Sequence, residues 1–161
     1  EGKAAFQIMG DRAKGEFTAA GKKPGVDYYC AATPSNNGYL YNVDSFIFYK
    51  TSDPDKQAGQ KLLAKLMMGK NFQKVFNLYK GSIPARLDVP MDEFDDCAKA
   101  SNADIKTSGA KGGLVPSFAH GMAQGNTMKA ALQDVITEHF NSDMSSKDAA
   151  NALADSVLQN M

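Results

Sequence analysis

The stretch GYLYNVDSFIFYK, residues 38–50, decides the fold that the sequence predicts. It begins at two turn-forming residues, Asn37 and Gly38. Side chains then alternate between two faces, with Asp44, Phe46 and Phe48 on one and Ser45, Ile47 and Tyr49 on the other. Alternation with a period of two is typical of a strand. We therefore expect residues 38–50 to form a strand that enters a core.

Two polar side chains lie at the start of this stretch. Asn42 and Asp44 are two residues apart, so on a strand they project from the same face. An amide and a carboxylate held side by side suit a ligand that offers adjacent hydroxyl groups. The alternative reading is a polar pair in a turn that precedes the strand.

The other elements follow from apolar spacing and capping residues. Short strands are predicted at 3–8 and 26–32. Helices are predicted from Asp11 to about Ala20, from Pro54 after the cap Asp53, over 72–79 with a stop at Gly81, over 91–101, over 116–140, and after Ser145, which forms a capping box with Asp148. Residues 82–90, SIPARLDVP, are predicted to be an extended crossover and a hinge, and 102–113 a loop. About three short strands against five or six helices is too little sheet for a complete α/β domain, so part of the sheet is expected to come from elsewhere.

Length and charge exclude several classes of protein. The 161 residues are enough for a domain with its own core. Eighteen basic and eighteen acidic side chains cancel, and without a basic run the chain lacks the electrostatic footprint of a nucleic-acid binder. No apolar run approaches the roughly 20 residues that span a bilayer, and the first residues do not resemble a signal peptide. The expectation is a soluble chain that is either a mature product or a piece of one.

The only two cysteines are Cys30 and Cys97. If they pair, the closed loop would contribute roughly 4 kcal/mol in the chain-entropy model, and an oxidising compartment would be implied. The alternative is two buried, small apolar side chains. No CxxC and no histidine at metal-binding spacing accompanies them, so no structural metal site is predicted.

Searches for catalytic motifs give little. GxGxxG, GxxxxGK[ST], HExxH and GxSxG are all absent from the sequence. A serine nucleophile acting with His120 or His139 has no supporting local context. The acidic residues 92–96 lack the glycine and alternating oxygen ligands of a calcium loop, so we interpret them as a solvated helix face. The sequence therefore predicts neither an enzyme nor a cofactor.

Two further polar residues have both a functional and a structural reading. His120 lies in SFAHGMA, where small neighbours let a ligand approach closely, although a lone histidine is more often structural. Lys80 lies in LYKGSIP before the proposed hinge, where a lysine is also favoured by the helix dipole.

These residues lie in motifs that resemble a known family. The stretches GKAAFQIMGD, GYLYNVDSF, SDPDKQAGQKLLAKLM, FQKVFNLYKGSIPAR, LVPSFAHGMA and DMSSKDAANALADSV occur in order over nearly the whole chain. Together they resemble the C-terminal part of the glucose-type, periplasmic sugar-binding proteins of bacterial ABC transporters, extracellular solute-binding protein family 1. Members of that family are considerably longer, so the resemblance implies a C-terminal fragment whose N-terminal part is missing here.

The resemblance implies an α/β fold of the class II periplasmic-binding-protein type, in which two lobes close over a sugar. Residues 1–37 and 87–161 would belong to the C-terminal lobe, and 38–86 would contribute to the N-terminal lobe. Motif by motif, the sugar-binding positions fall on Asn42, Asp44, Lys80 and His120. The implied partners are a monosaccharide, a membrane permease and the missing part of the same protein, in the periplasm and without nucleic acid.

Arg12 departs from the family pattern. After MGD the family usually has a tryptophan that stacks on the sugar, and this chain contains no tryptophan. Loss of an aromatic platform costs about 1 kcal/mol or more. Either the Arg12 guanidinium lies against the sugar ring, or the preferred sugar differs.

The sequence therefore predicts a carbohydrate-binding subunit of an importer, for glucose or a related aldohexose. The alternatives are a binding protein for a disaccharide or polyol, a helical interaction domain without a small ligand, and a carbohydrate-active enzyme. The enzyme would need two carboxylates at the site, and only Asp44 is placed there.

Overall fold

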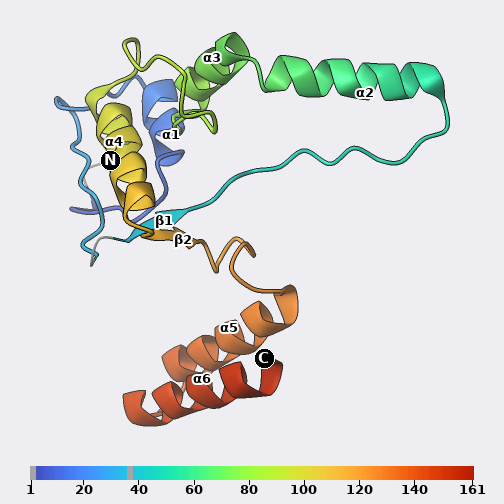
Figure 1. Ribbon diagram of the computed structural model, residues 1–161. Helices are drawn as coiled ribbons and strands as arrows, with labels where there is room; N and C mark the ends of the chain where they lie inside the picture. Colours follow the sequence, from blue (N-terminus) through green and yellow to red (C-terminus); the bar gives the residue numbers. More distant parts are fainter. Residues whose placement is uncertain (1–2, 36–37) are drawn as a thin grey trace. The chain divides into compact units, whose positions relative to one another are not determined.

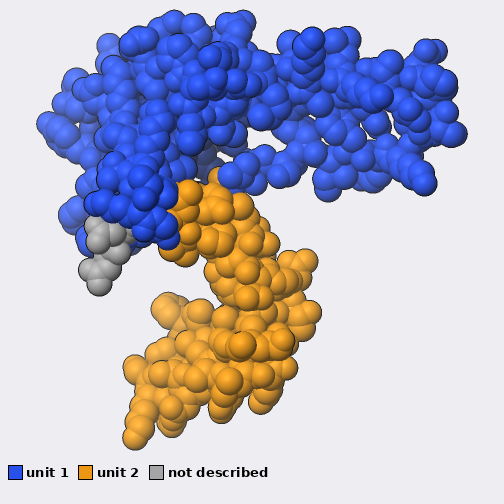
Figure 2. All heavy atoms as spheres, viewed as in Figure 1, with its two compact units in different colours: residues 1–39, 43–113 blue, residues 40–42, 114–161 orange. Residues whose placement is uncertain are grey.

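A computed structural model describes residues 3–35 and 38–161, so the turn predicted at Asn37 and the start of the chain at Glu1 lie outside the described residues. The chain divides into two compact units. The first unit contains residues 1–39 and 43–113, and the second contains residues 40–42 and 114–161 (Figure 2). The lobe boundaries implied by the family resemblance, 1–37, 38–86 and 87–161, remain a prediction.

Helices build the first unit (Figure 1). They are α1 (Ala13–Ala19), α2 (Pro54–Met67), α3 (Lys70–Lys80) and α4 (Asp96–Ala110). The Asp53 side chain accepts hydrogen bonds from the amides of Asp55 and Lys56, with Pro54 at the first helical position, which confirms the predicted start of α2. Helix α3 ends at Gly81, whose φ of 84° is the left-handed conformation that glycine adopts most readily.

Two glycines bring α1 against the end of α3. A Cβ on Gly15 would lie 2.6 Å from the Lys80 carbonyl oxygen, and a Cβ on Gly81 would lie 2.4 Å from the Gly15 nitrogen. Asp11 was predicted to cap α1, but its carboxylate instead accepts a hydrogen bond from the Ile83 amide at 2.9 Å, and α1 has no side-chain cap. The carboxylate therefore ties the start of α1 to the segment that leaves α3.

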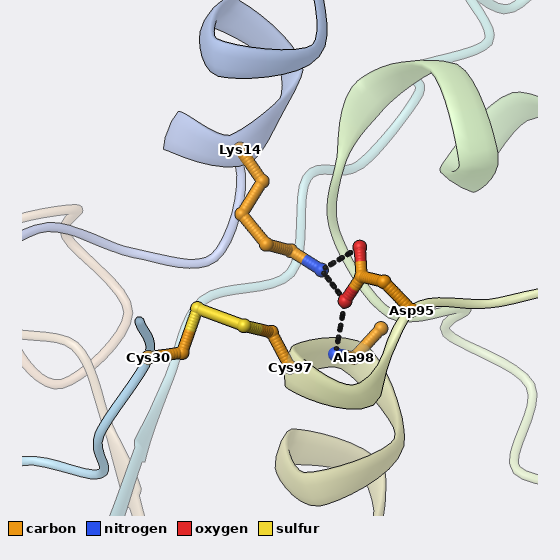
Figure 3. Close-up of a disulfide and its surroundings, with 5 residues drawn as sticks. All are labelled: Lys14, Cys30, Asp95, Cys97 and Ala98. Atoms are coloured by element: carbon orange, nitrogen blue, oxygen red, sulfur yellow. Dashed lines mark hydrogen bonds and ion pairs between the residues drawn. A yellow bond between two sulfur atoms is a disulfide. The ribbon is translucent and has the colours of Figure 1, made fainter. Parts of the chain in front are cut away.

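A disulfide and an ion pair fix the start of α4. Cys30 and Cys97 are bonded, with their Cα atoms 5.6 Å apart and a separation of 67 positions in the sequence. Beside them, the Lys14 ammonium contacts both carboxylate oxygens of Asp95, and Asp95 also caps α4 by accepting from the Ala98 amide (Figure 3). The disulfide thus joins an irregular segment to α4, whose start the ion pair of Lys14 and Asp95 also holds.

The second unit combines most of a two-stranded sheet, whose first residue Tyr39 belongs to the first unit, with two helices. Strands β1 (Tyr39–Tyr41) and β2 (Leu114–Pro116) pair, and helices α5 (Asn126–Asn141) and α6 (Ser146–Asn160) pack side by side (Figure 1). The Tyr39 amide bonds to the Gly113 carbonyl, and the Ser117 amide bonds to the Tyr41 carbonyl, so residue numbers rise together along the two strands, which therefore run parallel. Ser145 caps α6 and donates to the Asp148 carboxylate, which confirms the capping box.

Little of the described chain is deeply buried. The buried apolar residues are Met67, Val89, Phe94 and Ala98 in the first unit and Met128 and Ala149 in the second. Large apolar side chains are exposed along 46–49 and on α2, including Ile47 and Leu62. The architecture is helix-rich with a small sheet, and its apolar faces are largely uncovered by described residues. No helix in the described part of the chain is long and apolar enough to span a membrane.

The strand predictions were mostly wrong. Only Tyr39–Tyr41 of the 38–50 stretch is a strand, and the described residues of 3–8 and all of 26–32 contain none; the latter has a single bridge between Pro24 and Tyr28. A strand forms only where a partner supplies its hydrogen bonds, and the described residues offer these stretches none apart from β2. The same-face argument for Asn42 and Asp44 consequently fails, because both lie beyond the end of β1.

Two helix boundaries also differ from the prediction. Helix α4 begins at Asp96 and continues to Ala110, so residues 102–110, predicted as loop, are helical. Residues 116–125, predicted as helix, contain the end of β2 and turns, and α5 begins only after Gly125. Gly121, with a φ of 73°, explains why the helical pattern starts later than its apolar spacing indicates.

Candidate functional site

Asp44 and Lys80 lie together in the first unit. The Lys80 ammonium donates to the Asp44 carboxylate at 2.6 Å, although the two residues are 36 positions apart. The Asp44 side chain is 57% exposed and the Lys80 side chain is 30% exposed, so both groups can be reached from solvent. The structure therefore brings together two of the residues that the sequence proposed as ligands.

The end of α3 places the Lys80 side chain. Its ammonium lies 5.7 Å from the centre of the Phe76 ring, one helical turn earlier, and Phe76 stacks on Phe72 with ring centres 5.5 Å apart. A cation over an aromatic face is attracted to it. The ring, the carboxylate and the left-handed Gly81 thus limit where the ammonium can lie.

Arg12 lies on the surface at the first residue before α1, and its carbonyl accepts from the Gly15 amide at 3.1 Å. Because Gly15 contacts the Lys80 backbone, Arg12 belongs to the same junction of α1 and α3. The orientation of its guanidinium toward a sugar ring remains a prediction.

Asn42 and His120 belong to the second unit, where they follow the two parallel strands. Asn42 comes directly after β1, and His120 comes four residues after the end of β2; both are exposed. The carboxyl ends of parallel strands meet at one edge of a sheet, and ligands often bind there. The strand pairing therefore places these two predicted residues at a common edge.

Ser117 holds the His120 ring. Its hydroxyl lies 2.7 Å from His120 Nδ1, its amide donates to Tyr41, and its carbonyl accepts from Met122. Ser117 is buried, with 4% of its surface exposed. A buried residue anchored by its own backbone is thus bonded to an exposed histidine that was proposed as a ligand.

Two shallow hollows lie elsewhere on the first unit. One of about 520 Å³ is lined mainly by apolar residues of α2 and α3, including Leu62, Leu66 and Phe72. The other, about 260 Å³, lies near Lys70 and Glu93. Neither includes any of the five predicted ligand residues. In the described residues, no group of three or more histidine, cysteine, aspartate or glutamate side chains is placed to hold a metal ion.

These polar groups can bind hydroxyl groups. Carboxylate oxygens accept hydrogen bonds, an ammonium donates them, and an amide or a histidine ring can do both. Bonds to charged partners are roughly twice as strong as neutral ones. The chemistry of these side chains therefore suits a polyhydroxylated ligand.

The structure adds the residues Gly15 and Ser117, and further roles for Gly81 and Asp11, to what the sequence predicted. Gly15, Gly81 and Asp11 fix the junction beside Lys80, and Ser117 fixes His120. A glycine inside a helical pattern was the available signal for a close backbone approach at Gly15. A serine three residues before the histidine was the only local signal for the second contact.

Several proteins of known name are similar to this chain over nearly its whole length. No protein-family model matches the chain. It is 46% identical over 158 residues to a probable sugar-binding periplasmic protein of Brucella suis, covering 98% of this chain and 37% of that protein. It is 41% identical to a protein of the same name in Rhizobium meliloti, with 98% and 38% covered, and 37% identical to an uncharacterized ABC transporter extracellular-binding protein of Pyrococcus horikoshii, with 99% and 36% covered.

Over nearly its whole length the chain is thus similar to extracellular and periplasmic binding proteins. Within them, it is similar to those named sugar-binding periplasmic proteins, and it spans between a third and two fifths of the length of these curated relatives. The family resemblance read from the sequence motifs is therefore confirmed.

Proposed function

We propose that the chain is part of the sugar-binding subunit of an ABC importer, located in the periplasm, which captures an aldohexose such as glucose and delivers it to a membrane permease. Two relatives named sugar-binding periplasmic proteins support the class of ligand. The observation that carries the proposal is the solvent-accessible pair of Asp44 and Lys80, which unites two of the proposed ligand positions.

Asp44 and Lys80 complement a sugar hydroxyl. A hydroxyl group can donate to a carboxylate and accept from an ammonium at once, so adjacent donor and acceptor groups use its hydrogen and one of its two lone pairs. A polar group left unpaired in a closed site costs binding energy, and this makes such a pair selective for hydroxyls at fixed positions. By the family resemblance, Asn42 and His120 are further candidate ligands for sugar oxygens.

Delivery would follow from closure of two lobes in the full-length protein, of the class II type. Because a sugar held by both lobes binds the closed form better, it shifts the population toward that form. The closed form would then dock on the permease. The isolated chain lacks more than half of the length of its relatives, so the experiments below use the full-length protein.

Calorimetry with a panel of ligands tests the sugar. The panel contains glucose, galactose, mannose, xylose, maltose and mannitol. We expect the largest heat and the tightest binding with an aldohexose. Tighter binding of maltose or mannitol would replace the aldohexose by a disaccharide or polyol, and no heat with any of them would overturn the proposal.

Asp44→Ala tests the site. It should weaken hexose binding by at least about 2 kcal/mol, roughly thirtyfold, because sugar hydroxyls lose a charged acceptor. Glu93→Ala is the matched control, since Glu93 pairs with Lys74 at 2.7 Å with side-chain exposures of 63% and 28%. Equal affinities of the two variants would show that Asp44 has a structural role only. Turnover of chromogenic glycosides would instead support an enzyme.

A further inference from the structure

Among the described residues, the His120 ring has a hydrogen-bond partner at Nδ1 and none at Nε2. Nδ1 lies 2.7 Å from the Ser117 hydroxyl, while the residue as a whole is exposed. In a neutral imidazole only one nitrogen carries a hydrogen, so the partner of Nδ1 decides whether Nε2 donates or accepts a hydrogen bond. The chemistry that His120 offers to a ligand therefore depends on Ser117.

The surroundings of Ser117 favour one direction for this bond. Within the described part of the chain, Nδ1 is the only hydrogen-bond partner of the Ser117 hydroxyl. If Nδ1 carried the hydrogen and donated, the buried hydroxyl would keep a hydrogen with no acceptor, which is costly. If the hydroxyl donates to Nδ1, both groups are satisfied and the hydrogen of the ring lies on Nε2.

The backbone of Ser117 cannot easily turn to change this arrangement. Its amide donates to the Tyr41 carbonyl at 2.8 Å, directly after β2, and its carbonyl accepts from the Met122 amide at 3.0 Å. Ser117 is therefore held at the end of the parallel strand pair, and His120 lies in the turn that the second bond closes.

His139 shows the opposite case in the same unit. Its Nδ1 lies 2.8 Å from the Met144 carbonyl oxygen. A carbonyl only accepts, so Nδ1 of His139 must carry the hydrogen. The two histidines of this chain are thus expected to hold opposite tautomers, and His139 provides an internal reference.

We propose that Ser117 is a positioning residue that keeps the hydrogen of neutral His120 on Nε2. The Nε2–H group of His120 then donates a hydrogen bond to an oxygen atom of the sugar. This inference rests on the proposed function for the ligand. The tautomer itself does not, because it follows from contacts within the chain. It adds Ser117 to the residues that determine specificity and defines the complementary group on the ligand as an acceptor.

Nitrogen NMR of the full-length protein with labelled histidine tests the tautomer. Spectra are recorded at about pH 8.5, where an ordinary histidine is neutral. We expect the Nε2–H pattern for His120 and the Nδ1–H pattern for His139, with Ser117→Ala mixing the two forms at His120 only. An Nδ1–H pattern at His120 in the unaltered protein would overturn the proposal, even if Ser117→Ala failed to fold.

Calorimetry with the bound hexose tests the consequence. Ser117→Ala should weaken binding about three- to tenfold, the worth of one ordinary hydrogen bond, and Ser117→Thr should restore the affinity and the spectrum. Ser101→Ala is the control, because it removes a serine hydroxyl bonded to Tyr39 at 2.6 Å and should leave both readouts unchanged. His120→Gln, which keeps a donor at the position of Nε2, should bind better than His120→Asn.

A double variant separates this mechanism from a general loss of structure. In a His120→Ala background, Ser117→Ala should cause no further loss of affinity, because Ser117 acts only through the ring. Equal losses in both backgrounds would overturn the positioning role. If the unaltered protein binds no sugar, the proposed function fails, whereas the tautomer assignment is still decided by the spectrum.

Discussion

Lys14 is a buried cation whose partner is less buried than itself. Its side chain is 6% exposed, and that of Asp95, 2.8 Å away, is 34% exposed. Removing one partner of a buried ion pair leaves the other with no compensation, which costs 3–5 kcal/mol when both are deeply buried. Because water reaches Asp95, we expect Lys14→Met to lower the free energy of unfolding by about 2 kcal/mol, measured by urea unfolding.

Lys22→Met is the matched control for this prediction. Lys22 pairs with Asp27 at 3.2 Å, but its side chain is largely exposed. Exposed pairs contribute under about 1 kcal/mol, because water solvates both charges and salt screens them. Equal losses from the two variants would contradict a stabilising role for the buried pair beside the disulfide.

The lowered pKa of Asp88 makes the stability of the protein depend on pH. Hydrogen bonds from Arg86 and then from Lys70 hold the pKa of the Asp88 carboxyl well below its ordinary value. A carboxyl whose pKa is lowered by folding contributes stability above its unfolded pKa, near 4, and this contribution is lost as the pH falls through the folded pKa. Asp88→Asn should therefore flatten the acid limb of a plot of stability against pH.

Arg86→Gln provides the complementary test of Asp88. It removes the largest cause of the lowered pKa and keeps Lys70, so the Asp88 titration followed by carboxyl NMR should move upward in pH. A titration that stays in place would contradict the assigned cause. Since Asp88 is open to solvent, the effect should also decrease at high salt.

At the scale of elements, Gly81 combines a special backbone conformation with a close contact. Alanine at a left-handed position costs about 1–2 kcal/mol. At Gly81 the added Cβ would also meet the Gly15 nitrogen at 2.4 Å, so α1 and α3 would have to separate. We expect Gly81→Ala to cost more than 3 kcal/mol, a loss that normally indicates a specific steric mechanism.

Gly112→Ala isolates the conformational part of that cost. Gly112 has a φ of 68°, and a Cβ there would meet nothing within 4 Å. Its substitution should cost only the left-handed penalty in the same unfolding measurement. In the full-length protein Gly81→Ala should also weaken sugar binding, since it displaces the end of α3 that carries Lys80. Identical behaviour of the two variants would show that the contact between Gly15 and Gly81 is unimportant.

The elements that the sequence predicted well are those whose ends are fixed locally. Asp53 with Pro54, Ser145 with Asp148, and Gly81 each act within four residues, so their helix boundaries can be read directly. The strand over 38–50 required a distant partner, and only its first residues pair with β2. Alternation indicates which residues could form a strand, but hydrogen-bond partners decide whether they do.

The candidate site shows the same division between chemistry and position. Asp44 and Lys80 became candidate ligands through the motifs YNVD and YKGS and the family resemblance, because side-chain type alone also fits a structural role for each of them. The contact between them spans 36 residues and depends on the end of α3, which no local pattern reports. Ser117 was missed for a similar reason, since its effect on His120 depends on the strand pairing that buries it.

At the scale of the whole molecule, the main feature is apolar surface that no described residue covers. On α2, Leu62 and Leu66 are 70% and 59% exposed, and they border the hollow of about 520 Å³ that Phe72 and Val75 also line. Exposed apolar patches of this kind mark surfaces that are covered in a larger assembly or that cause aggregation. Together with the much greater length of the relatives, the exposed apolar side chains of α2 indicate a surface that further residues of a longer protein would cover.

The 161-residue chain alone should therefore differ from the full-length protein. We expect it to bind an apolar dye such as anilinonaphthalene sulfonate, to elute above its 17.3 kDa mass in gel filtration, and to bind hexose weakly or not at all. Leu62→Glu with Leu66→Glu should reduce dye binding and association, because charges on this face resist burial. Lys61→Glu, on the same helix but outside the residues that line this hollow, should have a much smaller effect. A monomeric chain that binds no dye would contradict this reading, because it would show that α2 needs no cover.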